Sequence, residues 1–176
     1  MAKKIVINDL SEIDFFKEKI LNNTLFATKK LAQTFMSLDG LEALKLLKFG
    51  KYGTDPLFEF EQNIIEQTNQ TFTYLVCLDA VKILMDRHNG TKYTVNFGTQ
   101  NGFDVTSTDE KIICECFAST RPDSNQKLEK DVKRVSLCGE ADFRYVIYYS
   151  EEEKTSYVNR ISDKYPNVTI IKLKGL

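Results

Sequence analysis

The spacing of apolar residues changes at His88-Asn89-Gly90, and this change constrains the fold most. Before it, a turn-rich stretch ends at Pro56 and residues 57–87 show helical spacing. After it, short segments alternate between apolar and polar residues or are continuously apolar, as strands do. The predicted strands are 93–97, 103–106 and 111–117. Because the turns between them are short, we expect an antiparallel meander that follows a long helix.

The rest of the pattern extends this meander into a mixed sheet. Ser124 is placed to cap a helix that runs to about Leu137. The later elements are predicted as a strand over 143–149, a helix over 151–164 and a strand over 168–173. A helix between two strands favours a parallel pair with a right-handed crossover. We therefore predict an α/β fold with a mixed central sheet flanked by helices.

The length of 176 residues predicts a single domain, 1–176, because domains contain roughly 100–200 residues. No linker or repeat divides the sequence. Residues 1–52 have a helical pattern in which Ser11 caps the first helix, and this N-terminal helical part precedes a core over 56–173.

The composition excludes several kinds of site. A single histidine, His88, rules out cages built from several histidines and weakens any catalytic triad that needs one. The four cysteines form no CxxC pair, which argues against a zinc site and favours free thiols in a reducing compartment. Neither a secretory signal nor an apolar run of about 18 residues is visible, so we expect a cytoplasmic protein without a membrane partner.

The candidate site begins with two acidic residues in strands whose composition is otherwise typical of buried strands. Asp104 lies in the second predicted strand and Glu115 in the third. Burying an ionised carboxylate costs free energy unless a cation or donor is near it. Since the strands are neighbours, the two acids can meet on one face and hold Mg²⁺, which prefers oxygen ligands. The alternative is that each acid lies on a solvated face of its strand.

A third acid can join this pair from the long helix. Glu61 falls in the middle of the apolar stripe of that predicted helix and is a candidate metal ligand. The alternative is that Glu61 is a first-turn residue stabilised by the helix dipole.

A basic arc follows on the helix after Ser124. Its members are Lys127, Lys130, Lys133 and Arg134, opposite an apolar stripe of Leu128, Val132 and Val135. A basic arc one helix away from a carboxylate pair suits the backbone of a nucleic acid beside metal ions. The alternative is the solvated face of an amphipathic helix. The net charge of −1 does not exclude this arc, because a basic face can lie opposite an acidic one.

These residues resemble the PD-(D/E)xK nuclease superfamily, the fold of many restriction endonucleases. The stretches that carry the resemblance are Gly102-Phe103-Asp104-Val105 and 112–117, set in the order α-β-β-β-α-β over roughly 56–173. The resemblance implies a restriction endonuclease-like core in which Asp104, Glu115 and Glu61 bind Mg²⁺, with Mn²⁺ as a substitute. It implies no small-molecule cofactor.

The sequence departs from the family pattern two residues after the glutamate, where Phe117 stands in place of the usual lysine. Some members of the superfamily carry this lysine on the following helix, which makes Lys127 the candidate here. The resemblance then implies Mg²⁺-dependent hydrolysis of phosphodiester bonds in DNA, with Asp104, Glu115 and Lys127 as the catalytic residues. A type II restriction endonuclease is one such enzyme.

The basic arc, with Lys130, Lys133 and Arg134, would then contact DNA. Cutting a duplex needs two active sites and so favours a homodimer. One rival hypothesis is a catalytically inactive member of the same fold that binds DNA or a partner, which Phe117 favours. The other is an unrelated α/β interaction module whose strand acids are merely exposed.

Overall fold

The computed structural model describes residues 3–98 and 101–176, and the contacts within the chain divide it into two compact units. The first unit is Met1–Ile13 together with Val76–Leu176, and the second is Asp14–Leu75. Helix α3 (Ile64–Arg87) contributes to both units. The organisation of the chain as a single domain, 1–176, stays a prediction.

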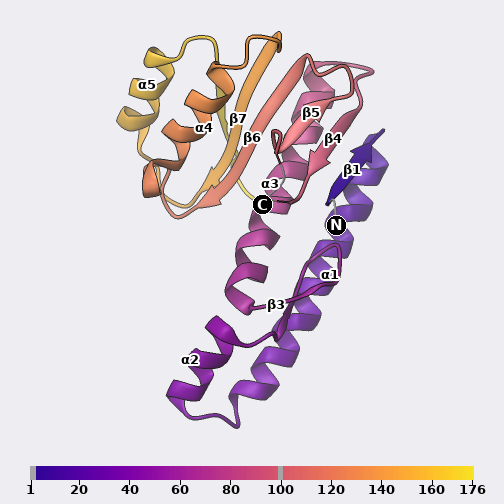
Figure 1. Ribbon diagram of the computed structural model, residues 1–176, viewed down its shortest axis with the longest axis vertical. Helices are drawn as coiled ribbons and strands as arrows, with labels where there is room; N and C mark the ends of the chain where they lie inside the picture. The colour runs from indigo at the N-terminus through magenta and orange to yellow at the C-terminus, as the bar shows by residue number, and fades with distance from the viewer. Residues whose placement is uncertain (1–2, 99–100) are drawn as a thin grey trace. The chain divides into compact units, whose positions relative to one another are not determined.

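Within the described residues, the first unit contains a mixed six-stranded sheet in the order β1-β4-β5-β6-β7-β8 (Figure 1). Its strands are β1 (Lys4–Ile7), β4 (Tyr93–Asn96), β5 (Val105–Ser107), β6 (Ile112–Ser119), β7 (Phe143–Ser150) and β8 (Thr169–Lys172). The pairs from β1 to β6 are antiparallel, whereas β6–β7 and β7–β8 are parallel. The predicted meander and the predicted parallel pair are therefore confirmed.

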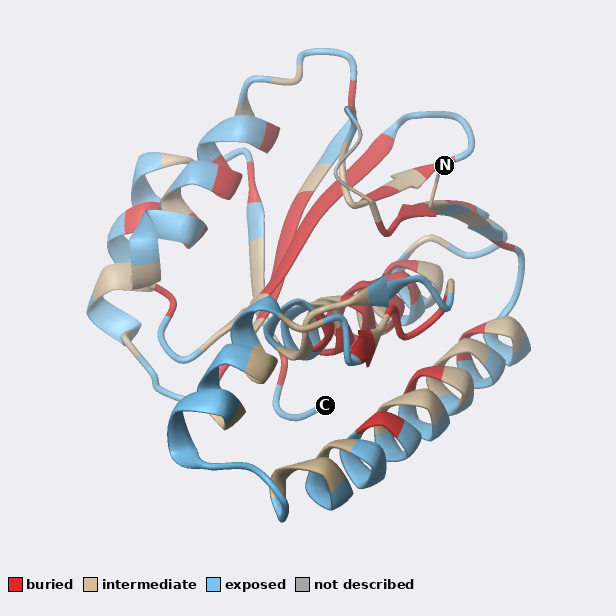
Figure 2. Cartoon of the chain, turned by 60° about the horizontal axis from the view of Figure 1, so that its bottom comes forward, coloured by how far each residue is buried: buried red, intermediate tan, exposed pale blue. Residues whose placement is uncertain are grey.

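Helices cover both faces of this sheet, which confirms the predicted mixed α/β class (Figure 1). Helices α4 (Lys127–Ser136) and α5 (Thr155–Lys164) pack on one face. Their shared core with the sheet contains Ile113, Phe117, Leu128, Val132, Val135, Val146, Tyr148 and Ile161. The C-terminal part of α3 packs on the other face, where the thiols of Cys77 and Cys116 are hydrogen-bonded. Buried residues accordingly concentrate on the central strands (Figure 2).

The prediction of a wholly helical N-terminal part is wrong at its start. Residues Lys4–Ile7 form β1, which pairs with β4 at the edge of the sheet, and Ile7 is fully buried. The β-branched run Ile5-Val6-Ile7 favours a strand, a signal that the helical pattern after it outweighed.

The second unit is mainly helical, as predicted for most of residues 10–49. It contains α1 (Leu10–Phe35) from Asp14 onward and α2 (Gly40–Phe49). Asp39 caps α2 by accepting a hydrogen bond from the backbone N–H of Glu42. Two short strands, β2 (Gly53–Thr54) and β3 (Glu61–Gln62), pair antiparallel before α3 begins.

Helix α3 begins at Ile64 and not near residue 57, so the predicted start is wrong. The side chain of Asn63 accepts a hydrogen bond from the backbone N–H of Glu66 at 2.8 Å, which caps the helix there. The preceding segment is a turn held by Asp55, a fully buried residue. The carboxylate of Asp55 accepts hydrogen bonds from the backbone N–H groups of Leu57 and Phe58 and from the hydroxyl of Tyr74.

Two predicted helix starts in the first unit are also wrong. Ser124 begins a short 3₁₀ turn, Ser124–Gln126, and not α4. Asn125 and Gln126 adopt left-handed backbone conformations, with φ of 51° and 56°, so the chain changes direction before Lys127. Helix α5 begins at Thr155 and not at residue 151.

The turn held by Asp55 yields a stability prediction. Asp55→Ala should lower the free energy of unfolding in urea by more than about 2 kcal/mol, because several buried donors lose their acceptor. Tyr74→Phe removes one of these donors together with its hydrogen bond and should cost about 1 kcal/mol. Equal losses in the two variants would show that Asp55 does not organise this turn.

Candidate functional site

The sheet brings Asp104 and Glu115 together. Asp104 directly precedes β5 and does not lie inside a strand as predicted, whereas Glu115 lies in the middle of β6. The register pairs Val105 with Cys114, and extending it by one residue places Asp104 opposite Glu115. The backbone N–H of Cys116 donates a hydrogen bond of 2.8 Å to Asp104 Oδ2 and so fixes this carboxylate.

Glu115 is a buried acid, and its environment strongly disfavours the ionised form of its carboxyl group. Its side chain is 2% exposed. Burial raises its pKa to about 9, and the charge of Asp104 and a hydrogen bond with that carboxylate add to the effect. Arg134, in an ion pair with Glu115 Oε1, opposes the rise without cancelling it. The Asp104–Glu115 pair therefore holds a proton at neutral pH.

Arg134 links α4 to the segment that carries Asp104. Its guanidinium pairs with Glu115, donates a hydrogen bond to the carbonyl oxygen of Gly102 and lies 5.2 Å from the ring centroid of Phe103. Arg134 was predicted on a basic arc opposite the buried stripe, and that placement is wrong. Its side chain is half exposed and reaches across to the sheet.

Lys127 is held by a carboxylate of its own helix. Its Nζ donates a hydrogen bond of 2.8 Å to Asp131 Oδ1. Burial alone would lower the pKa of Lys127, but the hydrogen bond to Asp131 outweighs it, and the pKa is raised. The charges of Asp104 and Glu115 act in the same direction. The Lys127 ammonium is therefore charged and electrostatically coupled to the carboxylate pair.

Phe117 occupies the position two residues after Glu115, on the same face of β6. The Lys127 ammonium lies 6.0 Å from the Phe117 ring centroid. The other contact of Phe117 is a stacked arrangement with Tyr148, with ring centroids 5.1 Å apart. An ammonium from α4 thus extends over the ring that stands in the place of the strand lysine.

Asp131 is a site residue that the sequence analysis missed. It is 5% exposed, and burial raises its pKa, an effect that Lys127 opposes and Asp104 reinforces. The signal was present, because Lys127, Asp131 and Arg134 have i, i+4 and i+7 spacing and share one helix face. That face borders the apolar stripe, so α4 turns all three side chains toward the sheet.

The other predicted site residues lie elsewhere. Lys130 and Lys133 are on the solvent face of α4, where Lys130 Nζ donates to the carbonyl oxygen of Asn125 at 2.9 Å. Glu61 was predicted on a helix, but it is exposed in β3, because α3 begins only after Asn63. Glu61 belongs to the second unit, and the site is built from the first unit alone.

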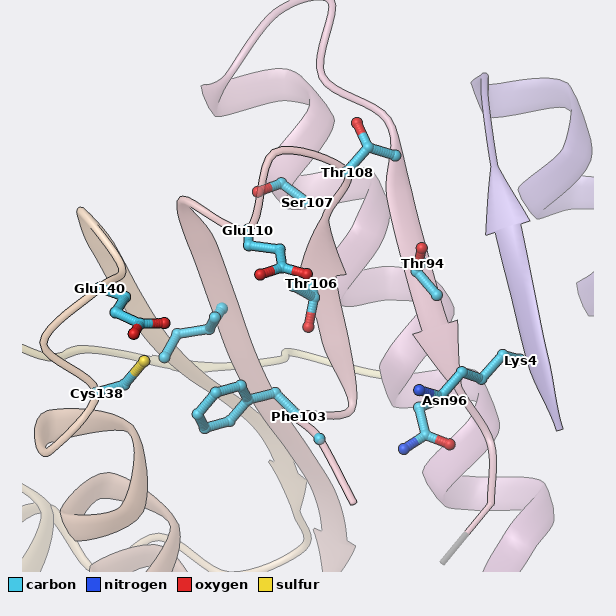
Figure 3. Close-up of a pocket in the computed structure, with 12 residues that line it drawn as sticks. Lys4, Thr94, Asn96, Phe103, Thr106, Ser107, Thr108, Glu110, Cys138 and Glu140 are labelled. Atoms are coloured by element: carbon cyan, nitrogen blue, oxygen red, sulfur yellow. The ribbon is translucent and has the colours of Figure 1, made fainter. Parts of the chain in front are cut away.

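A groove of about 430 Å³ lies on the first unit (Figure 3). Thr94, Asn96 and Thr106 of β4 and β5 contribute polar side chains to it. Gly102 and Phe103, the residues that Arg134 contacts, line the groove directly before Asp104. The charged side chains that line it are Lys4, Glu110 and Glu140. The groove therefore combines apolar and polar lining with one positive and two negative side chains.

The donor set suits a hard divalent cation. Asp104, Glu115 and Asp131 offer only carboxylate oxygens, which Mg²⁺ prefers over nitrogen or sulfur. Among the described residues, the buried atom Asp131 Oδ2 has no hydrogen-bond donor, and Glu115 Oε1 is met by the ion pair with Arg134. No cluster of three or more acids, histidines or cysteines in the described part of the chain is arranged to bind a metal by itself. Mg²⁺ needs no such cluster, since it is commonly bound by one or two carboxylates with water and phosphate oxygens.

No family model matches the chain, and no curated protein matches it significantly in sequence. None of the helices in residues 3–98 and 101–176 has the length and apolar character that crossing a membrane requires. The metal-binding and catalytic roles of Asp104, Glu115 and Lys127 stay predictions.

The raised pKa of Glu115 gives a pH-dependence of stability. The folded protein holds a proton that the unfolded chain releases above about pH 4.5, so Glu115 lowers the free energy of unfolding as the pH rises toward 9. Relative to wild type, Glu115→Gln should become more stable by up to about 1.4 kcal/mol per pH unit in this window. Urea unfolding at about pH 6 and about pH 8 measures the difference.

The matched control is Glu140→Gln, which removes an exposed carboxylate of the same unit. It should leave the pH profile unchanged. A wild-type profile parallel to that of Glu115→Gln would contradict the shared proton.

Proposed function

We propose that the protein is a metal-dependent nuclease that hydrolyses phosphodiester bonds in DNA. The observation that carries this proposal is that Asp104, just before β5, meets Glu115 of β6, while the Lys127 ammonium of α4 is electrostatically coupled to both. Two carboxylates with an adjacent ammonium form the minimal set that metal-assisted phosphodiester hydrolysis needs.

The arrangement of elements also supports a restriction endonuclease-like core. Helix α3 is followed by β4, β5 and β6 as an antiparallel meander, then by α4 and the parallel strand β7. The aspartate directly precedes the second strand of this meander, and the glutamate lies within the third. Both positions agree with the resemblance to PD-(D/E)xK nucleases described above.

Mg²⁺, or Mn²⁺ in its place, would be held by Asp104 and Glu115. Such an ion supplies Lewis-acid polarisation of the scissile phosphate and lowers the pKa of a bound water. The chain's own part is to position groups around the phosphate. Lys127 would orient the attacking water or neutralise developing charge, and Asp131 holds the Lys127 ammonium in place and keeps it protonated.

DNA would approach along the solvent face of α4 and the neighbouring groove. Lys130 and Lys133 supply positive charge for backbone phosphates, which position a duplex without reading its sequence. The groove carries one lysine and two glutamates, so it suits polar contacts to bases more than contacts to phosphates. Phe103, at the end of the groove nearest Asp104, offers an aromatic face for stacking.

A catalytically inactive protein of the same fold is the alternative. Phe117 stands where the strand lysine would be and is buried against Tyr148. Arg134 pairs with Glu115, so the carboxylate already has a cation beside it. In this alternative the protein binds DNA or a partner without cleaving it.

The first test is cleavage of duplex and single-stranded DNA with Mg²⁺ or Mn²⁺. Asp104→Asn, Glu115→Gln and Lys127→Met should each lower the cleavage rate at least about 100-fold, because each removes charge at the reacting phosphate. Lys82→Met, which removes an exposed lysine of α3, is the matched control and should cleave at the wild-type rate.

Calorimetry with Mn²⁺ separates the two functions. Binding that is lost in Asp104→Asn, together with cleavage, supports the nuclease. No cleavage of either DNA form by the folded wild-type protein, with no Mn²⁺ binding, would favour the inactive alternative.

Asp131 should act as a positioning residue. Asp131→Asn keeps the shape but removes the charge that holds Lys127, so we expect cleavage to fall about 10-fold and its pH profile to shift, because the Lys127 pKa falls. Steady-state rates over a range of pH measure both effects. A loss of cleavage without a changed pH profile would indicate a purely structural role.

A further inference from the structure

Helix α1 has apolar side chains on two opposite faces. Ile20 and Ala27 lie on the buried face, at 0% and 6% exposure. The other face carries large apolar side chains that are exposed: Phe15 at 62%, Leu21 at 56%, Leu25 at 54% and Phe26 at 72%. A pale blue flank runs along much of this helix (Figure 2). We call the surface formed by Phe15, Leu21, Leu25 and Phe26, with the charged residues between them, the outer face of α1.

A helix at the surface of a monomer needs only one apolar face. Contiguous exposed apolar side chains with polar residues among them are typical of an interaction surface. Two phenylalanines and two leucines are large enough to bury several hundred Å² on each copy, which approaches the roughly 800 Å² per partner of a standard interface. The outer face of α1 is therefore suited to pack against another apolar helix.

The positions of two charged residues on the outer face indicate that its partner is a second copy of the chain. Glu18 and Lys29 both lie near its middle, at roughly 100° of rotation per residue. In the described part of the chain neither side chain has an ion-pair partner. The two residues are equally far along the helix from a point between Asn23 and Thr24. A two-fold axis at that point places Glu18 of one copy opposite Lys29 of the other, twice.

We propose that the outer face of α1 pairs antiparallel with the same face of a second copy of this chain. In this arrangement Leu21 and Leu25 of both copies meet beside the two-fold axis, flanked by the Glu18–Lys29 pairs. A parallel pair is disfavoured because it would place Glu18 against Glu18. Such an interface is isologous, as in most homodimers.

The oligomeric state of the full chain tests the pairing. Light scattering after size exclusion should give twice the mass of the chain for wild type at about 100 µM. Leu25→Arg should give the mass of a single chain, because it buries a charge at the two-fold axis. Leu41→Arg replaces a similarly exposed leucine of α2, at 63% exposure, and should leave the dimer intact. A wild-type monomer, or loss of the dimer in Leu41→Arg but not in Leu25→Arg, would overturn the proposal.

Charge reversal tests the antiparallel register. Glu18→Lys and Lys29→Glu each place like charges opposite one another and should weaken dimerisation about tenfold or more. The double variant Glu18→Lys/Lys29→Glu restores opposite charges across the two-fold axis and should recover the wild-type dissociation constant. Circular dichroism confirms that each variant keeps its helices. Failure of the double variant to recover the dimer, or single variants as tight as wild type, would overturn the register.

Discussion

The ion pair between Glu115 and Arg134 is the interaction on which the site depends. It connects the centre of β6 to α4, and through Gly102 and Phe103 it also fixes the segment that carries Asp104. A carboxylate that is 2% exposed is tolerated inside a sheet only with a cation and a shared proton near it. The Glu115–Arg134 pair therefore joins α4 to the sheet and to the segment before β5.

The same requirement explains the composition of the cluster around it. Asp104, Glu115 and Asp131 face Lys127 and Arg134, and one retained proton makes the group neutral. Buried ionisable groups are tolerated when opposite charges and hydrogen bonds balance them in the absence of water. The cluster also leaves Asp131 Oδ2 without a hydrogen-bond donor, which is an unusual state for a buried polar atom.

Much of the fold followed from local patterns. The alternation of apolar residues over 93–117 predicted the meander, and the helix between two strands predicted the parallel pair β7–β8. The element ends were harder to predict. The start of α3 depended on the cap at Asn63 and on a turn held by Asp55, whose partner Tyr74 lies far along the chain. The β-branched run over residues 5–7 favours a strand, but its pairing with β4, some 90 residues away, is not visible in any local pattern.

By itself the sequence directed attention to carboxylates and lysines, because one histidine weakens any site that depends on imidazole. It also predicted that Asp104 and Glu115 meet, since the short turns dictate the pairing of β5 with β6, although Asp104 lies just before β5. Only the tertiary structure decided which cations meet them. Lys127 and Arg134 point toward the sheet, whereas Lys130 and Lys133 point to solvent. The rotation of α4 decides this, and the packing of its apolar stripe, Leu128, Val132 and Val135, sets that rotation. The role of Asp131 follows from the same packing, because a charge on a helix becomes a site residue only when its face is buried.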